Sequence, residues 1–259
     1  MKHHYLWPIF ILLLLITLAI VWPNNGQEVN LMHRLQGPSW SYWFGTDWLG
    51  RDMFGRTLKA LLYSLSISGA AVVLCSVIAL LFAVIANVNK TLNSTVDFLV
   101  DALLSLPSLL LLIILTVVLG GGTQGIIFAV SLSHWPKLAR LCKQEIHTLM
   151  NQDYIQYALG FGHNKWYAIL RHALPHVLPQ WMLGVLLLFP HVILHIAGMS
   201  FLGFGLNSSY PSMGKILSEA NTYLLTGEWW LALFPGITLV VTTLLISLSI
   251  RSLSSMACR

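Results

Sequence analysis

Long apolar runs without charged residues alternate with polar segments along the whole chain. The runs cover residues 6–22, 60–89, 102–136, 172–214 and 229–250. Each is long enough to cross a hydrocarbon layer of about 30 Å, which takes roughly 20 helical residues. The run at 102–136 contains a glycine-rich stretch at 120–125 that a continuous helix would tolerate poorly, so we expect two spans there. The pattern predicts an all-α integral membrane protein with about six transmembrane helices.

Composition and charge agree with a protein embedded in lipid. Hydrophobic residues make up 56% of the 259 residues and charged residues only 9%, whereas soluble domains carry about 25% charged residues. The formal net charge of +5 comes from Lys and Arg beside the predicted spans and not from a basic face with interleaved aromatics, so we expect no nucleic-acid partner. Tryptophans near predicted span ends, such as Trp7, Trp22 and Trp229, fit an aromatic belt at the lipid headgroups.

The polar segments divide a single predicted membrane domain, residues 1–259, into three parts. Residues 5–22 are predicted to form a retained anchor helix, because the apolar run ends in Trp22-Pro23 without a cleavage site of small residues. Residues 23–59 are predicted to form an extracytoplasmic segment. Residues 60–256 then form a core of five helices.

Segment 137–171 holds the largest concentration of charged residues and is expected to lie outside the bilayer. Six spans put both termini on the same side as this segment, and Lys and Arg near span ends are more numerous on that side. The positive-inside rule makes it the cytoplasmic side. Four basic residues in the opposite segment are a counter-signal, although acidic residues accompany them: Arg34, Arg51, Arg56 and Lys59. We therefore predict that both termini are cytoplasmic.

A spaced motif occupies the polar segment 152–175. Gln156-Tyr157-Ala158 is followed by Gly162 and, twelve residues later, by Leu174-Pro175. The spacing resembles the cytoplasmic coupling segment of ABC importer permeases, here residues 144–175, in which a Glu-Ala-Ala sequence precedes the Gly and the Leu-Pro. Gln156 takes the place of the Glu and keeps hydrogen bonding while removing the charge. The resemblance implies a segment that docks on a separate ATPase, with coupling residues Tyr154, Gln156, Tyr157, Ala158, Gly162, Leu174 and Pro175; the alternative is an ordinary loop.

The segment 44–56 carries a second motif. Asp47 and Arg51, and Asp52 and Arg56, are spaced i,i+4 with the acid first, which favours a short helix at the membrane surface. The segment resembles the one before the second helix in the dipeptide, oligopeptide and nickel branch of these permeases. This resemblance indicates the branch of the family and does not by itself indicate a functional site. Its motif residues are Gly45, Thr46, Asp47, Gly50, Arg51, Asp52 and Arg56.

The predicted fourth and fifth spans contain histidines. His191 and His195 lie one turn apart on one helix face, and Met199 continues that face. Imidazole and thioether groups facing the interior of a bundle are suitable ligands for a late transition metal on a transport path, and His134 could add a polar contact. The alternatives are that each imidazole donates to a backbone carbonyl and that His134 serves packing. Residues 132–140 and 191–205 resemble the nickel-type second permease subunit.

The resemblance implies a type I ABC importer permease fold in a bacterial inner membrane. The chain would be one permease subunit of a binding-protein-dependent importer for nickel or a metal chelate. The alternatives are an importer of dipeptides or oligopeptides and, more remotely, a passive channel or a structural membrane subunit. The implied partners are a second homologous permease, two cytoplasmic ABC ATPases that bind ATP and Mg, and an extracytoplasmic solute-binding protein.

The chain itself is expected to have no cofactor and no enzymatic activity. The pair His191 and His195 lacks the Glu that zinc proteases need after the first His, since Val192 stands there. The glycine-rich stretch 120–125 lacks the Lys-Ser/Thr of a nucleotide-binding loop.

Overall fold

The computed structural model describes residues 6–23, 26–204 and 211–257, and every regular element in them is a helix. The elements are α1 (Trp7–Val21), η1 (Leu31–His33), α2 (Met53–Ala86), α3 (Lys90–Leu104), α4 (Ser108–Val118), α5 (Gly122–Met150), α6 (Asp153–Gly160), α7 (Lys165–Ala168), η2 (Ile169–Ala173), α8 (Leu174–Phe201), α9 (Met213–Asn221), η3 (Leu224–Thr226) and α10 (Trp230–Ala257). Gly205, the last residue of the nickel-type resemblance, and both chain ends lie outside the described residues. The predicted all-α architecture is confirmed.

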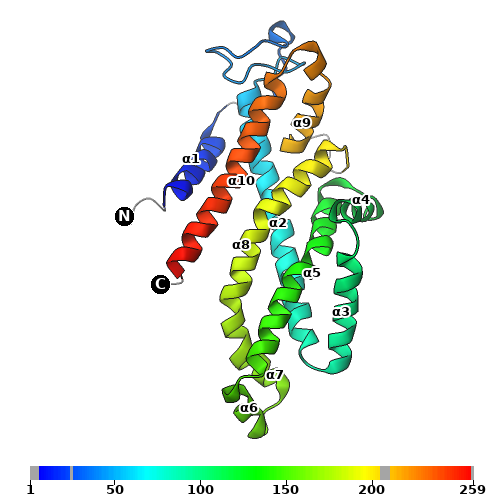
Figure 1. The fold of residues 1–259 in the computed structure, drawn as a ribbon. Coiled ribbons are helices and arrows are strands. Elements are labelled where there is room, and N and C mark those ends of the chain that lie inside the picture. Colours follow the sequence, from blue (N-terminus) through cyan, green and yellow to red (C-terminus); the bar gives the residue numbers. More distant parts are fainter. Residues whose placement is uncertain (1–5, 24–25, 205–210, 258–259) are drawn as a thin grey trace.

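The long helices form an elongated bundle (Figure 1). α2, α5 and α8 pack against one another, α10 packs on α8 and α9, and α1 packs on α10. The short helices α6 and α7 lie at one end of the bundle, hereafter the α6 end. α9 and the segment 26–52 lie at the opposite end, hereafter the α9 end (Figure 1).

Three of the described helices are long and apolar enough to cross a membrane: α2, the continuous helix from Lys165 to Phe201, and α10. The pair α3 and α4 could serve as a fourth span, although it bends by 100° at the break. The two other predicted spans do not meet the same criterion, since α1 is apolar but short and α5 carries polar residues such as Gln124 and Lys137 along its length.

Several helix boundaries differ from the predicted ones. α2 begins at Met53 and not near residue 60, because the Asp52 carboxylate accepts hydrogen bonds from the backbone N–H groups of Phe54 (3.2 Å) and Gly55 (3.0 Å) and caps the helix. The third predicted span is divided at Pro107, where α3 gives way to α4. The glycine break is present as predicted, between α4 and α5.

α5 continues through Pro136, where the sequence predicted the fourth span to end. Proline removes one backbone hydrogen bond from a helix interior. Trp135, Leu138 and Ala139 are nevertheless buried in a core cluster shared with α2 and α8. Their burial holds α5 in one piece across the proline.

Small residues let α2 approach α5 closely. Ala71, Cys75, Ala79 and Ala83 recur every four residues on α2 and are fully buried. Small side chains on one face allow two helix backbones to come near each other in a membrane. The approach permits the Ser131 hydroxyl on α5 to donate to the Ala71 carbonyl at 3.0 Å. Cys75 and Cys142 are both buried free thiols within this packing.

Candidate coupling and transport sites

The predicted coupling segment, residues 144–175, begins in the last turns of α5, and two short helices, α6 and α7, joined by a tight turn, follow. α6 ends at Gly160, Phe161 is its C-cap, and the next residue, Gly162, has φ of +90°. Its N–H donates to the Leu159 carbonyl at 3.0 Å, and the His163 N–H donates to the Ala158 carbonyl at 3.4 Å. This pair of bonds is a Schellman motif, in which glycine is favoured at the left-handed position. Gly162 is therefore required by the backbone of the turn.

α6 has one exposed aromatic face. Tyr154, Tyr157 and Phe161 lie at i, i+3 and i+7, and their exposed fractions are 47%, 70% and 87%. Residues at this spacing share one side of a helix. Ile155 is fully buried in the same core cluster as Met150 and Ile169. The helix is thus anchored on one side and open on another, while Ala158 is half-buried.

The second half of the segment runs into the bundle without a loop. α7 passes through the π-helical turn η2 directly into α8, so that Leu174 and Pro175 begin α8. Ile169 and Ala173 in the turn are fully buried. The wide turn ends two residues before Pro175, whose nitrogen cannot donate a hydrogen bond. A single helix from Lys165 to Phe201 therefore connects the α6 end with the α9 end.

Gln156 is directed back toward the bundle. Its Nε2 donates to the backbone carbonyl of Met150, the last residue of α5, at 2.7 Å. The residue that replaces the Glu of the family pattern thus makes a contact within the chain.

Two of the predicted path histidines meet between α5 and α8. His134 Nε2 lies 3.0 Å from His195 Nδ1. His134 Nδ1 lies 3.1 Å from the Val130 carbonyl oxygen. Ser133 Oγ adds a contact of 2.6 Å to His134 Nδ1, and His134 is buried.

The other two predicted path residues lie elsewhere. His191 is exposed and lines a groove of about 270 Å³ between α8 and α10, together with Thr243, Ser247 and Arg251. Met199 is buried in an apolar cluster with Ile196. Within the part of the chain that the structure describes, no three His, Cys, Asp or Glu side chains gather into a group that could hold a metal ion.

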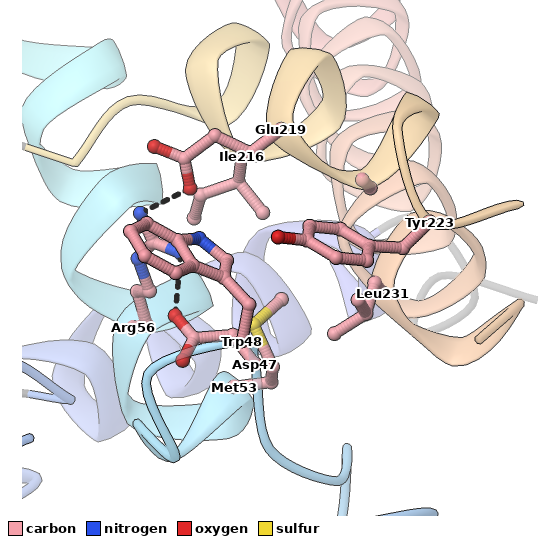
Figure 2. Close-up of a pocket in the computed structure, with 9 residues that line it drawn as sticks. Asp47, Trp48, Met53, Arg56, Ile216, Glu219, Tyr223 and Leu231 are labelled. Atoms are coloured by element: carbon pink, nitrogen blue, oxygen red, sulfur yellow. Dashed lines mark hydrogen bonds and ion pairs between the residues drawn. The ribbon is translucent and has the colours of Figure 1, made fainter. Parts of the chain in front are cut away.

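The segment 44–56 forms a buried ion-pair network and not the predicted surface helix (Figure 2). The predicted Asp47–Arg51 pair is present at 2.6 Å. Arg56 does not pair with Asp52, because the Asp52 side chain caps α2. Its guanidinium instead donates to Asp47 at 2.9 Å and to Glu219 of α9 at 2.6 Å. The side chains of Arg56 and Asp47 are only 5% and 2% exposed.

The remaining motif residues hold the loop in shape. The Thr46 hydroxyl donates to the His33 carbonyl at 2.5 Å and accepts from the Gln36 N–H at 2.9 Å. Gly45 and Gly50 both have positive φ, and a Cβ on Gly50 would lie 1.8 Å from the Asn30 carbonyl oxygen. Sequence reasoning missed Glu219, since it lies 163 residues from Arg56 and belongs to no motif.

Comparison with known proteins agrees with this architecture. Residues 75–256 match the family model described as "Binding-protein-dependent transport system inner membrane component". The chain is 31% identical to a "Putative peptide transport system permease protein" of Brucella suis, over 92% of this chain and 82% of that protein. It is 30% identical to the dipeptide transport system permease protein DppC of Alkalihalophilus pseudofirmus, over 90% of this chain and 77% of the relative.

A solved structure shares the fold. An inward-facing structure of the MetNI methionine ABC transporter superposes with a TM-score of 0.65 at 18% identity, over 80% of this chain and 98% of that chain. The predicted type I permease fold is confirmed, as is the prediction of a membrane subunit without enzymatic activity of its own. The chain belongs to the family of binding-protein-dependent transport system inner membrane components, the permease subunits of ABC importers.

Proposed function

We propose that this chain is a permease subunit of an ATP-driven importer of short peptides. The relatives named for peptide and dipeptide transport support this substrate class, which was the alternative in the sequence analysis. Nickel has less support, because His191 and Met199 lie apart from the His134–His195 pair. The proposed complex contains a second homologous permease, two ABC ATPases and an extracytoplasmic solute-binding protein.

The exposed aromatic face of α6 is the observation that carries the proposal. In it, the α6 end is cytoplasmic, both chain termini are on that side, and Tyr154, Tyr157 and Phe161 dock on an ATPase subunit. Aromatic side chains are enriched at protein interfaces and supply much of their binding energy. Movement of the ATPases would reach α8 through the continuous helix from Lys165 and switch the bundle between two rigid arrangements.

The histidines take different roles in this proposal. His134 and His195 form a structural link between α5 and α8, since their ring nitrogens bond to each other. His191 faces the solute, because it is the exposed member of the three and lines the groove with Arg251. Groups that line a transport path bind the solute weakly enough for it to leave.

Uptake measurements test the proposal. Cells that express the complete importer are assayed with a radiolabelled dipeptide and with radiolabelled nickel. We expect dipeptide uptake with the natural chain and its loss in Gly162→Asp, whose side chain is strained at φ of +90° on the docking turn. Gly227→Asp is the matched control, since Gly227 has φ of +104° and open surroundings at the α9 end. Nickel uptake without dipeptide uptake would reject the substrate class, and full activity of Gly162→Asp would reject the docking role.

A further inference from the structure

The side chain of Gln156 lies on the side of α6 away from the aromatic face. At 3.6 residues per turn, Gln156 is rotated around the helix axis by about 160° from Tyr154, about 140° from Phe161 and about 100° from Tyr157. Its neighbour Ile155 is fully buried in the core cluster. The two residues therefore attach α6 to the bundle, one by apolar packing and one by the 2.7 Å hydrogen bond to the Met150 carbonyl.

The Met150 carbonyl needs a donor from outside its own helix. The last four carbonyls of a helix lack partners within it. At the end of α5, the Thr148 carbonyl accepts from the Asn151 N–H at 3.3 Å and the Leu149 carbonyl accepts from the Gln152 N–H at 2.9 Å. The carbonyl of Met150 accepts from the Gln156 amide. Gln156 is thus a side-chain cap of α5.

A carboxylate at position 156 could not make this bond. A carbonyl oxygen only accepts, and an ionised carboxylate has no proton to donate. The C-terminal end of a helix also carries a partial negative charge, which repels an anion and favours an amide donor or a cation. The Glu that the family pattern places here would therefore lose the bond and add repulsion.

We propose that Gln156 is a positioning residue that fixes the orientation of α6 on the end of α5. This inference rests on the proposed docking role of α6. With the Gln156 amide bonded to Met150, the docking face is formed by the aromatic residues Tyr154, Tyr157 and Phe161, and the exposed Asp153 borders it. The ATPase surface that receives it then needs no basic group opposite residue 156.

A series of three variants tests whether a donor is required. Gln156→Glu keeps the side-chain length and replaces the donor with a charged acceptor. Gln156→Met keeps the length without donor or charge, and Gln156→Lys supplies a donor and a cation. Each complete importer is reconstituted with its ATPases and binding protein in lipid vesicles, and dipeptide uptake per ATP hydrolysed is measured together with co-purification of the ATPases.

We expect uptake per ATP to fall about 2- to 10-fold in Gln156→Glu and Gln156→Met, the factor by which one net hydrogen bond changes an equilibrium. The ATPases should still co-purify, and Gln156→Lys should retain most of the natural coupling. Natural coupling in Gln156→Glu would overturn the inference, as would an equal loss in all three variants.

Gly162→Asp in the same assay separates this inference from the proposed function. If Gly162→Asp abolishes uptake while Gln156→Glu has no effect, only the role of Gln156 is wrong. If Gly162→Asp leaves uptake intact, the docking role of α6 is wrong, and the inference falls with it.

Discussion

One end of the bundle has a buried ion-pair network, and the other end has a helix with an exposed aromatic face. At the α9 end, Arg56 is buried between Asp47 and Glu219 and joins the segment before α2 to α9 (Figure 2). Arg140 of α5 pairs with Asp101 of α3 while both side chains are at least half exposed. At the α6 end, α6 exposes an aromatic face. At the α9 end, the charges of Arg56 and Asp47 are compensated within the chain. At the α6 end, Tyr157 and Phe161 are left uncovered by the chain.

Breaking the network at the α9 end should have the largest effect on stability. Arg56→Met removes the shared partner of Asp47 and Glu219 and leaves buried carboxylate charge without its full compensation. Loss of one member of a buried ion pair costs about 3 to 5 kcal/mol. Thermal unfolding of the purified chain in detergent measures the loss. A loss of stability no larger than that caused by Arg140→Met would contradict the stabilising role of the network.

Truncating the aromatic face should weaken partner binding and leave the chain stable. Tyr157→Ala removes a side chain that is 70% exposed, so its effect on unfolding should stay within about 0.5 kcal/mol. Its loss from a docking contact should cost about 2 kcal/mol of binding free energy, the usual size for a central interface tyrosine. Titration of the purified ATPase onto the chain in nanodiscs measures this cost.

Leu225→Ala is the control for Tyr157→Ala. Leu225 is 97% exposed and lies between α9 and α10, at the other end of the bundle. We expect it to leave ATPase binding unchanged. Equal weakening by both variants would mean that α6 is not the docking element.

The smallest effect is expected for the exposed ion pair. Arg140→Met breaks the link to Asp101 between α5 and α3. Exposed pairs contribute less than about 1 kcal/mol, so unfolding should shift only slightly and the shift should shrink further in high salt. A loss comparable to that of Arg56→Met would remove the contrast between the two ends.

The sequence predicted correctly those structural features that depend on residues close together in the chain. The glycine break before α5 and the Asp47–Arg51 pair both involve residues close together in the chain, and both are present. The bend between α3 and α4 was not predicted. Pro107 was the available signal, because a proline disfavours the helical conformation of the residue before it.

Side-chain pairs that form only when distant helices pack together have no pattern in the sequence from which they could be predicted. Arg56 and Glu219 meet only because α9 folds back onto the start of α2, and Asp52 was a nearer partner in sequence. His134 and His195 are 61 residues apart and meet only through the packing of α5 on α8. His191 and His195 share the spacing of a helix face, yet their rings have different surroundings, because the imidazole of His195 turns toward α5.

The unbroken helix from Lys165 to Phe201 has a mechanical consequence. Its 37 residues span about 55 Å at 1.5 Å per residue, so a tilt of one degree about its α6 end displaces the far end by roughly 1 Å. Pro179 and Pro190 lie within it, and prolines are where a helix bends most readily. The second of them directly precedes His191. A small rotation of the helix at its α6 end would thus produce a larger displacement at its far end. Bending at Pro190 would also change the direction of the helix beside His191 and His195.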